Sequence, residues 1–232
     1  MVYKALSIIP ARGGSKRIPR KNIKEFVDQP IIAYSIRAAL RSGCFDEVMV
    51  STEDQEISTV ATRYGAMVPF LRSPRTADDM AMLADVIAEV LSAYKKRGKE
   101  FKYFCCILPT APFVTNALLK RGYDLLVQSG ADSVVPVVRF SYPIQRALKI
   151  DHGTLKMFWP ENYNKRSQDL EPAYHDCGQF YWMKSESLLE QKKLFARNTV
   201  PLEISEMEMQ DIDVEEDWKI AEVKYKLLNG MI

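Results

Sequence analysis

Short and long apolar segments alternate along the first two thirds of the chain, and this alternation predicts an α/β sheet. Nearly continuous apolar runs at residues 3–9, 45–51, 66–71, 103–108 and 132–138 have the length of buried strands. Between them, residues 30–40, 54–64, 82–96 and 115–129 carry apolar side chains at helical spacing, and a glycine follows each segment. We therefore expect helices packed on a mostly parallel sheet.

The alternation stops after Arg139. Residues 140–178 contain three prolines, and a turn signal at 151–153 predicts a β-hairpin between residues 147–150 and 154–158. We expect an inserted subdomain at about 140–178 within a single domain, 1–232. A strand at 179–183, a short helix at 185–191, a strand at 200–204 and a helix at 214–228 complete the predicted elements.

Composition limits the class of protein. At 232 residues the chain can bury one sizeable core, and its charged fraction of 27% is typical of a soluble globular protein. The net charge of +2 argues against a general nucleic-acid-binding protein. No apolar run approaches the roughly 18 residues of a membrane span, and no signal segment opens the chain. The cysteines match no zinc spacing, so we expect a cytoplasmic protein with reduced thiols.

A basic loop directly follows the first predicted strand. Gly13 and Gly14 permit backbone conformations that a β-carbon would disfavour, so main-chain amides can approach a ligand. The same loop carries five cations, Arg12, Lys16, Arg17, Arg20 and Lys21. We interpret it as a phosphate-binding loop, although it matches neither the Walker nor the GxGxxG pattern. The alternatives are a solvated basic connection or part of a nucleic-acid-binding or regulatory module without turnover.

Two further polar segments are candidates for the same site. Asp211 and Asp213 lie two residues apart, so in an extended segment their carboxylates face the same side and could share a magnesium ion. Alternatively, Asp213 caps the final helix. The polar segment around Arg166 and Gln168 either lines a ligand pocket or forms a surface loop.

Several motifs, in order, resemble one enzyme family. They are Ile9-Pro-Ala-Arg-Gly-Gly-Ser-Lys16 with Lys21-Asn22, Leu71-Arg72, Pro109-Thr-Ala-Pro112, Arg166 near Gln168-Asp-Leu170, and Gln210-Asp-Ile-Asp213. Together they resemble the cytidylyltransferases that activate nine-carbon 2-keto sugar acids, the N-acylneuraminate type. The resemblance covers nearly the whole chain. It implies a Rossmann-like, three-layer nucleotide-diphospho-sugar-transferase fold with a mixed, mostly parallel sheet.

The resemblance also implies a reaction and a division of roles. The anomeric hydroxyl of the sugar acid would attack the α-phosphorus of cytidine triphosphate (CTP), releasing pyrophosphate, with Mg2+ bound by Asp211 and Asp213. Catalysis would rest on Arg12, Lys21, Asp211 and Asp213. The implied nucleotide-binding residues are Ala11, Arg12, Gly13, Ser15, Lys16, Lys21, Asn22 and Arg72. The sugar acid would contact Arg146, Arg166, Gln168 and Tyr181, and the inserted segment would build a homodimer.

The sequence departs from sialic-acid members of this family at several positions. Leu108 stands where they usually have glutamine, Val114 where they have arginine, and residues 166–171 read Arg-Ser-Gln-Asp-Leu-Glu. These features resemble the branch acting on pseudaminic acid, and an apolar Leu108 suits a deoxy, acylated sugar with fewer hydroxyls. N-acetylneuraminic and legionaminic acids are the alternative substrates.

Overall fold

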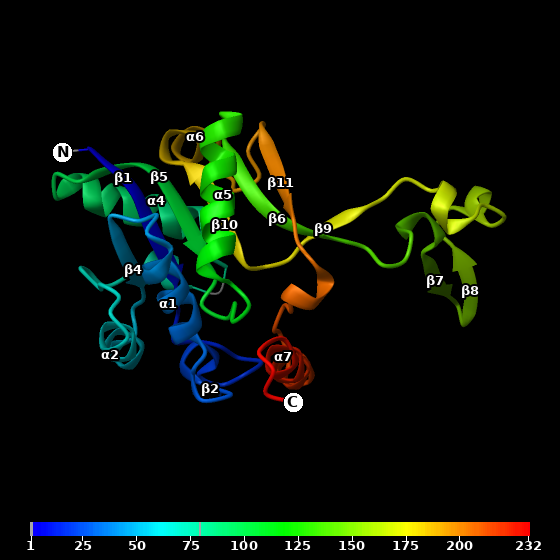
Figure 1. The fold of residues 1–232 in the computed structure, drawn as a ribbon, viewed down its shortest axis with the longest axis horizontal. Coiled ribbons are helices and arrows are strands. Elements are labelled where there is room, and N and C mark those ends of the chain that lie inside the picture. The colour runs from blue at the N-terminus through cyan, green and yellow to red at the C-terminus, as the bar shows by residue number, and fades with distance from the viewer. Residues whose placement is uncertain (1, 79) are drawn as a thin grey trace.

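A computed structural model describes residues 2–78 and 80–232, and its centre is a seven-stranded sheet (Figure 1). Six strands follow the order β11-β6-β10-β5-β1-β4, and β9 pairs with β6. Their bounds are β1 Val2–Pro10, β4 Glu47–Ser51, β5 Glu100–Ile107, β6 Ser133–Arg139, β9 Tyr174–Asp176, β10 Phe180–Lys184 and β11 Thr199–Glu203. Only β9 and β10 pair antiparallel with their neighbours in this sheet, so the expected mixed, mostly parallel sheet is confirmed.

Helices cover both faces of the sheet and complete three layers. One face packs against α1 (Ile32–Ser42), α2 (Gln55–Arg63) and α5 (Asn116–Ser129), and the other against α4 (Leu83–Lys96) and α6 (Ser185–Gln191). Local signals explain where two of these helices begin. The Asp54 side chain accepts a hydrogen bond from the amide of Ile57, and Thr115 does the same for Leu118. None of the helices in the described ranges is long and apolar enough to cross a membrane.

The last helix, α7 (Glu215–Leu228), packs against the loop that follows β1. Phe26 lies in β2 (Glu25–Phe26), which pairs with β3 (Gln29–Pro30), and its ring is fully buried. The centroids of the Phe26 and Trp218 rings lie 5.6 Å apart in an edge-to-face arrangement. Burying such a ring contributes about 2–3 kcal/mol, so the C-terminal helix fixes the base of the N-terminal loop.

An arm formed by residues 140–173 projects from the body at the far ends of β6 and β9 (Figure 1). It contains a hairpin of β7 (Leu148–Asp151) and β8 (Thr154–Met157), as the turn signal predicts. His152 and Gly153 both have positive φ, 48° and 76°, which suits a two-residue hairpin turn. Three 3-10 turns complete the arm, at Ile144–Arg146, Pro160–Asn162 and Ser167–Asp169.

The predicted strand at residues 66–71 is wrong. Within it, only Met67 bridges to Met49 of β4, through hydrogen bonds that its main chain makes with Val48 and Val50. Pro69 has no N–H to continue the ladder, so the pairing ends there. The polar segment that follows contains a short helix, α3 (Pro74–Ala77), and Asp79 lies outside the described residues.

Candidate active site

A cavity of about 500 Å3 opens at the carboxyl ends of β1 and β5. The crevice beyond the carboxyl ends of parallel strands is the usual ligand site in open α/β sheets. Three segments line it: the loop after β1, the segment from Arg72 to the start of α4, and the turn after β5. From the first segment come Pro10, Arg12, Ser15, Lys16, Arg17, Lys21 and Asn22. The cavity therefore brings the predicted phosphate-binding residues together.

Hydrogen bonds to the main chain hold the basic loop in place. The amide of Ala11 donates to the carbonyl of Ser51 in β4, with N and O 2.9 Å apart. The buried side chain of Asn22 donates through Nδ2 to the carbonyl of Arg12 at 2.9 Å, so it fixes the loop across its two ends. Asn22 thus supports the backbone that carries the cations, in addition to lining the cavity.

Lys21 connects the basic loop to the acidic segment before α7. It begins a 3-10 turn, Lys21–Ile23, and its Nζ donates to the carbonyl of Ile212 at 2.6 Å. The same Nζ lies 3.8 Å from Oδ1 of Asp213. Burial lowers the pKa of Lys21, while the charges of Asp213 and Asp211 act in the opposite direction. A cation placed there is poorly solvated and therefore interacts strongly with an incoming phosphate.

Asp211 and Asp213 lie near Lys21, but neither of them is among the residues that line the cavity. Burial of the Asp211 carboxyl and the nearby charge of Asp213 raise the pKa of Asp211, although its side chain keeps contact with solvent. Asp213 Oδ1 accepts a hydrogen bond from Arg17 at 2.7 Å. Within residues 2–78 and 80–232, no group of three or more His, Cys, Asp or Glu side chains could hold a metal ion. Two carboxylates fit Mg2+, which commonly completes its shell with water and substrate phosphates.

Arg72 lines the same cavity from the segment that follows β4. Its guanidinium donates to Ser51, from Nη2 to the main-chain oxygen at 2.6 Å and from Nε to Oγ at 3.1 Å. The side chain is only 7% exposed, and burial lowers its pKa. Because both contacts are to β4, the guanidinium is held in one orientation at the edge of the cavity.

The residues expected to bind the sugar acid lie elsewhere in the chain. Arg146, Arg166 and Gln168 are exposed on the arm, far from the basic loop (Figure 1). Arg166 pairs with Asp169, with Nε and Oδ2 2.7 Å apart. Tyr181 is buried in β10, and its hydroxyl donates to Asp176. One chain therefore brings six of the eight predicted nucleotide-binding residues to the cavity, but none of these four sugar-binding candidates.

Comparison with known proteins identifies the family. The family model described as cytidylyltransferase matches residues 6–220. The chain belongs to the cytidylyltransferase family. It is 40% identical to the pseudaminic acid cytidylyltransferase of Campylobacter jejuni, over 97% of each chain. It is also 34% identical to the CMP-N,N'-diacetyllegionaminic acid synthase of Legionella pneumophila, over 94% of each.

A solved structure shares the fold of this cytidylyltransferase. The CMP:2-keto-3-deoxy-manno-octonic acid synthetase, complexed with CTP, superposes with a TM-score of 0.71 at 16% identity. The superposition covers 98% of this chain and 100% of the other. At that identity the likeness concerns the fold alone, and it agrees with the expected nucleotide-diphospho-sugar-transferase architecture.

Sequence reasoning missed how the cytidylyltransferase anchors its basic loop to α2. Arg20 has a left-handed backbone, with φ 55°, and its guanidinium grips Asp54 through two hydrogen bonds of 2.6 and 3.0 Å. Arg20 Nη2 also donates to Glu56 at 2.5 Å. At the other end of the loop, the Gly13 amide donates to Glu53 at 2.7 Å, and a β-carbon on Gly13 would lie 2.5 Å from Asp54 Oδ2. The order β5-β1-β4 was the missing signal, because it places residues 53–56 beside the loop.

We predict that Arg20→Leu raises the KM for CTP roughly five- to tenfold, because the loop must then be ordered at the expense of binding energy. Arg20→Lys keeps the charge but loses the two-pronged contact, so its KM for CTP should lie between those of Arg20→Leu and the wild type.

Pairing with Arg20 lowers the pKa of Asp54 to about 2. The stability that the pair contributes should therefore be complete above the ordinary carboxyl pKa, near 4, and be lost as the pH falls from there towards 2.

Steady-state kinetics and thermal unfolding between pH 2 and 7 would measure both effects. Arg63→Leu, an exposed change on α2, is the matched control. A KM for CTP in Arg20→Leu equal to that of Arg63→Leu would show that Arg20 does not order the loop.

Proposed function

We propose that this enzyme transfers CMP from CTP to the anomeric hydroxyl of pseudaminic acid, with release of pyrophosphate. The main support is the 40% identity, over 97% of each chain, to a relative named for that activity. The sequence at Leu108 agrees, because this partly buried leucine lines the same cavity as Arg12 and Lys21. A wall without a hydrogen-bonding side chain suits a sugar that presents few hydroxyls.

The mechanism follows from the charges around the cavity. As the anomeric oxygen attacks the α-phosphorus, negative charge shifts to the β-phosphate that leaves as pyrophosphate. Arg12 and Lys21 would neutralise the phosphate oxygens, while Asn22 keeps the main chain of Arg12 in position. Asp211 and Asp213 would hold Mg2+, which would supply further positive charge to the phosphates. No covalent intermediate with the enzyme is needed. Arg72 would contact the cytosine end of the nucleotide.

The arm supports a further proposal, that two chains form a homodimer in which each arm reaches the partner's active site. Large apolar side chains are exposed along it, including Tyr142 at 84%, Ile150 at 79% and Leu155 at 65%. Covering such a surface favours association. Arg146 and Arg166 would then grip the carboxylate of the sugar acid from the partner chain. Sedimentation of the wild type and of an Ile150→Asp, Leu155→Asp variant tests this proposal, because the wild type should have the mass of a dimer and the variant that of a monomer. A monomeric mass for both proteins would rule the homodimer out.

Pyrophosphate release measured with three sugar acids would test the proposed substrate. We expect kcat/KM for pseudaminic acid to exceed that for N-acetylneuraminic and legionaminic acids by at least tenfold, because each misplaced polar group in a shaped pocket costs about 1–3 kcal/mol. A preference for N-acetylneuraminic acid would refute the assignment. Salt-sensitive binding to oligonucleotides without CTP consumption would instead indicate a nucleic-acid-binding module.

A further inference from the structure

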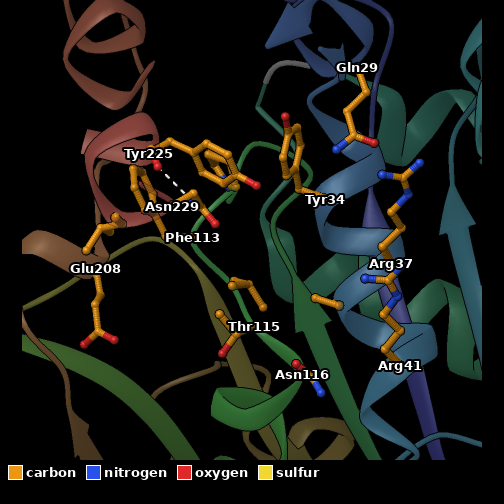
Figure 2. Close-up of a pocket in the computed structure, with 14 residues that line it drawn as sticks. Gln29, Tyr34, Arg37, Arg41, Phe113, Thr115, Asn116, Glu208, Tyr225 and Asn229 are labelled. Carbon is orange, nitrogen blue, oxygen red and sulfur yellow. Dashed lines mark hydrogen bonds between the residues drawn. The ribbon is translucent and has the colours of Figure 1, made fainter. Parts of the chain in front are cut away.

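The acidic segment before α7 depends on other elements for its position. Residues 209–214 carry Asp211 and Asp213, and in the described structure they form neither a helix nor a strand. They follow the 3-10 turn Glu206–Glu208, and Glu208 borders a cavity of about 400 Å3 between α1, α7 and the start of α5 (Figure 2). Carboxylates that hold a metal ion need fixed positions, so contacts from outside the segment must supply them.

Three side chains from other elements hold the main chain here. Lys21 and Lys224 donate to carbonyls within the segment, at 2.6 and 3.0 Å, and Gln179 Nε2 donates to the carbonyl of Glu208 at 2.6 Å. Gln179 differs from both lysines, because it is uncharged and only 1% exposed. It can therefore hold the start of the segment even when a phosphate attracts the ammonium group of Lys21.

The main chain of Gln179 is bonded to the wall of the cavity beside the basic loop. Its carbonyl accepts the amide of Leu108 at 2.8 Å, and Leu108 lines that cavity. Gln179 Oε1 is buried and has no hydrogen-bond partner in the described part of the chain. A buried amide oxygen without a partner costs stability, so packing alone does not explain a glutamine at this position.

The turn that contains Gln179 also lies against Asp211. The preceding residue, Gly178, has a positive φ of 60°, and a β-carbon there would lie 3.4 Å from Cγ and from Oδ1 of Asp211. Asp176 fixes the same turn, because its Oδ1 accepts the amide of Gly178 at 2.9 Å and its Oδ2 accepts the hydroxyl of Tyr181. The turn between β9 and β10 therefore packs against one of the two candidate metal-binding carboxylates.

We propose that Gln179 is a positioning residue, which fixes Asp211, and with it the bound divalent cation, relative to the wall of the cavity at Leu108. This inference rests on the proposed function, in which Asp211 and Asp213 hold Mg2+. Mg2+ requires nearly ideal octahedral geometry, so a displaced ligand weakens its binding. Removing a group that orients metal ligands typically lowers metal affinity 10- to 100-fold.

Binding of Mn2+ alone, measured by the electron paramagnetic resonance signal of the free ion, tests the proposal. Mn2+ prefers the same oxygen ligands as Mg2+. We expect Gln179→Met, which has a similar size but cannot donate a hydrogen bond, to bind Mn2+ at least tenfold more weakly than the wild type. Gln191→Met is the matched control. Gln191 on α6 donates from Nε2 to Asp132 at 3.4 Å, outside the cavity, so this variant should keep the wild-type affinity.

Thermal unfolding without metal separates positioning from a purely structural role. A changed Tm in Gln179→Met with unchanged Mn2+ affinity would overturn the proposal, as would a wild type that does not bind Mn2+. Gly178→Ala is a second variant, for use if Gln179→Met does not fold. Its β-carbon would press against Asp211, so Mn2+ binding should weaken here too, and wild-type affinity would contradict the role of this turn.

Kinetics distinguish this proposal from the proposed function. Gln179→Met should raise the Mg2+ concentration needed for half-maximal pyrophosphate release at least tenfold, while the KM for the sugar acid changes less than twofold. If no protein released pyrophosphate with pseudaminic acid but the difference in Mn2+ affinity remained, the proposed function would fail and the positioning of Asp211 would stand. Pyrophosphate release by all proteins with equal Mn2+ affinities would have the opposite meaning.

Discussion

Replacing Lys21 with alanine is expected to lower kcat for pyrophosphate release by about 100- to 1,000-fold, the usual cost of removing a preorganised group that stabilises developing charge. The structure gives the reason. Lys21 is held at 2.6 Å by the carbonyl of Ile212 and is largely shielded from water, so its charge is neither mobile nor screened. The KM for the sugar acid should change little, because the cation acts on the phosphates.

Lys120→Ala is the control for this experiment. Lys120 is an exposed lysine on α5 that pairs with Asp124, at 2.9 Å, outside the cavity. It should retain full activity. Thermal unfolding of both variants would show whether the loss of the hydrogen bond to Ile212 loosens the fold. An unchanged kcat in Lys21→Ala would remove Lys21 from the mechanism.

Replacing Asp211 with asparagine should lower kcat by at least 100-fold and raise the Mg2+ concentration needed for half-maximal activity, because one of two carboxylate ligands is lost.

The same replacement should increase the stability of the metal-free protein. Burial and the charge of Asp213 raise the pKa of Asp211, so its ionised form costs stability at neutral pH, and this cost fades as the pH falls through the raised pKa. Without metal, Asp211→Asn should therefore have a higher Tm than the wild type at pH 7, and the difference should narrow on acidification.

Thermal unfolding with and without Mg2+ and CTP separates these effects. The ligands should raise the Tm of the wild type more than that of Asp211→Asn. Glu216→Gln, an exposed change in the first turn of α7, should match the wild type throughout. If Asp211→Asn kept the wild-type dependence on Mg2+, these aspartates would not bind the metal.

The sequence predicted the sheet and most of its helices because hydrophobic periodicity reports burial directly, and burial defines these elements. The prediction of a strand at residues 66–71 failed because an apolar run does not reveal whether its backbone amides have hydrogen-bond partners. Pro69 has no backbone N–H, so it cannot continue the pairing. The basic loop was recognisable because its glycines and cations are contiguous. The Arg20 contact with Asp54 was not, because it depends on which strands become neighbours.

The same limit applies to cavities assembled from distant segments. The cavity of Figure 2 takes residues from β3, α1, the start of α5 and α7, and no single motif joins them. By contrast, Arg146 and Arg166 belong to one segment, 140–178, which the sequence marks by the change of pattern after Arg139.

The packing of α7 against Ile18 and Phe26 has a consequence for biosynthesis. The basic loop is synthesised well before Trp218 and Ala221, which cover it. During translation the loop cannot complete its packing and has only an incomplete hydrophobic base. The capacity to hold CTP should therefore arise only after α7 has been synthesised, so that a chain truncated before α7 would not sequester nucleotide.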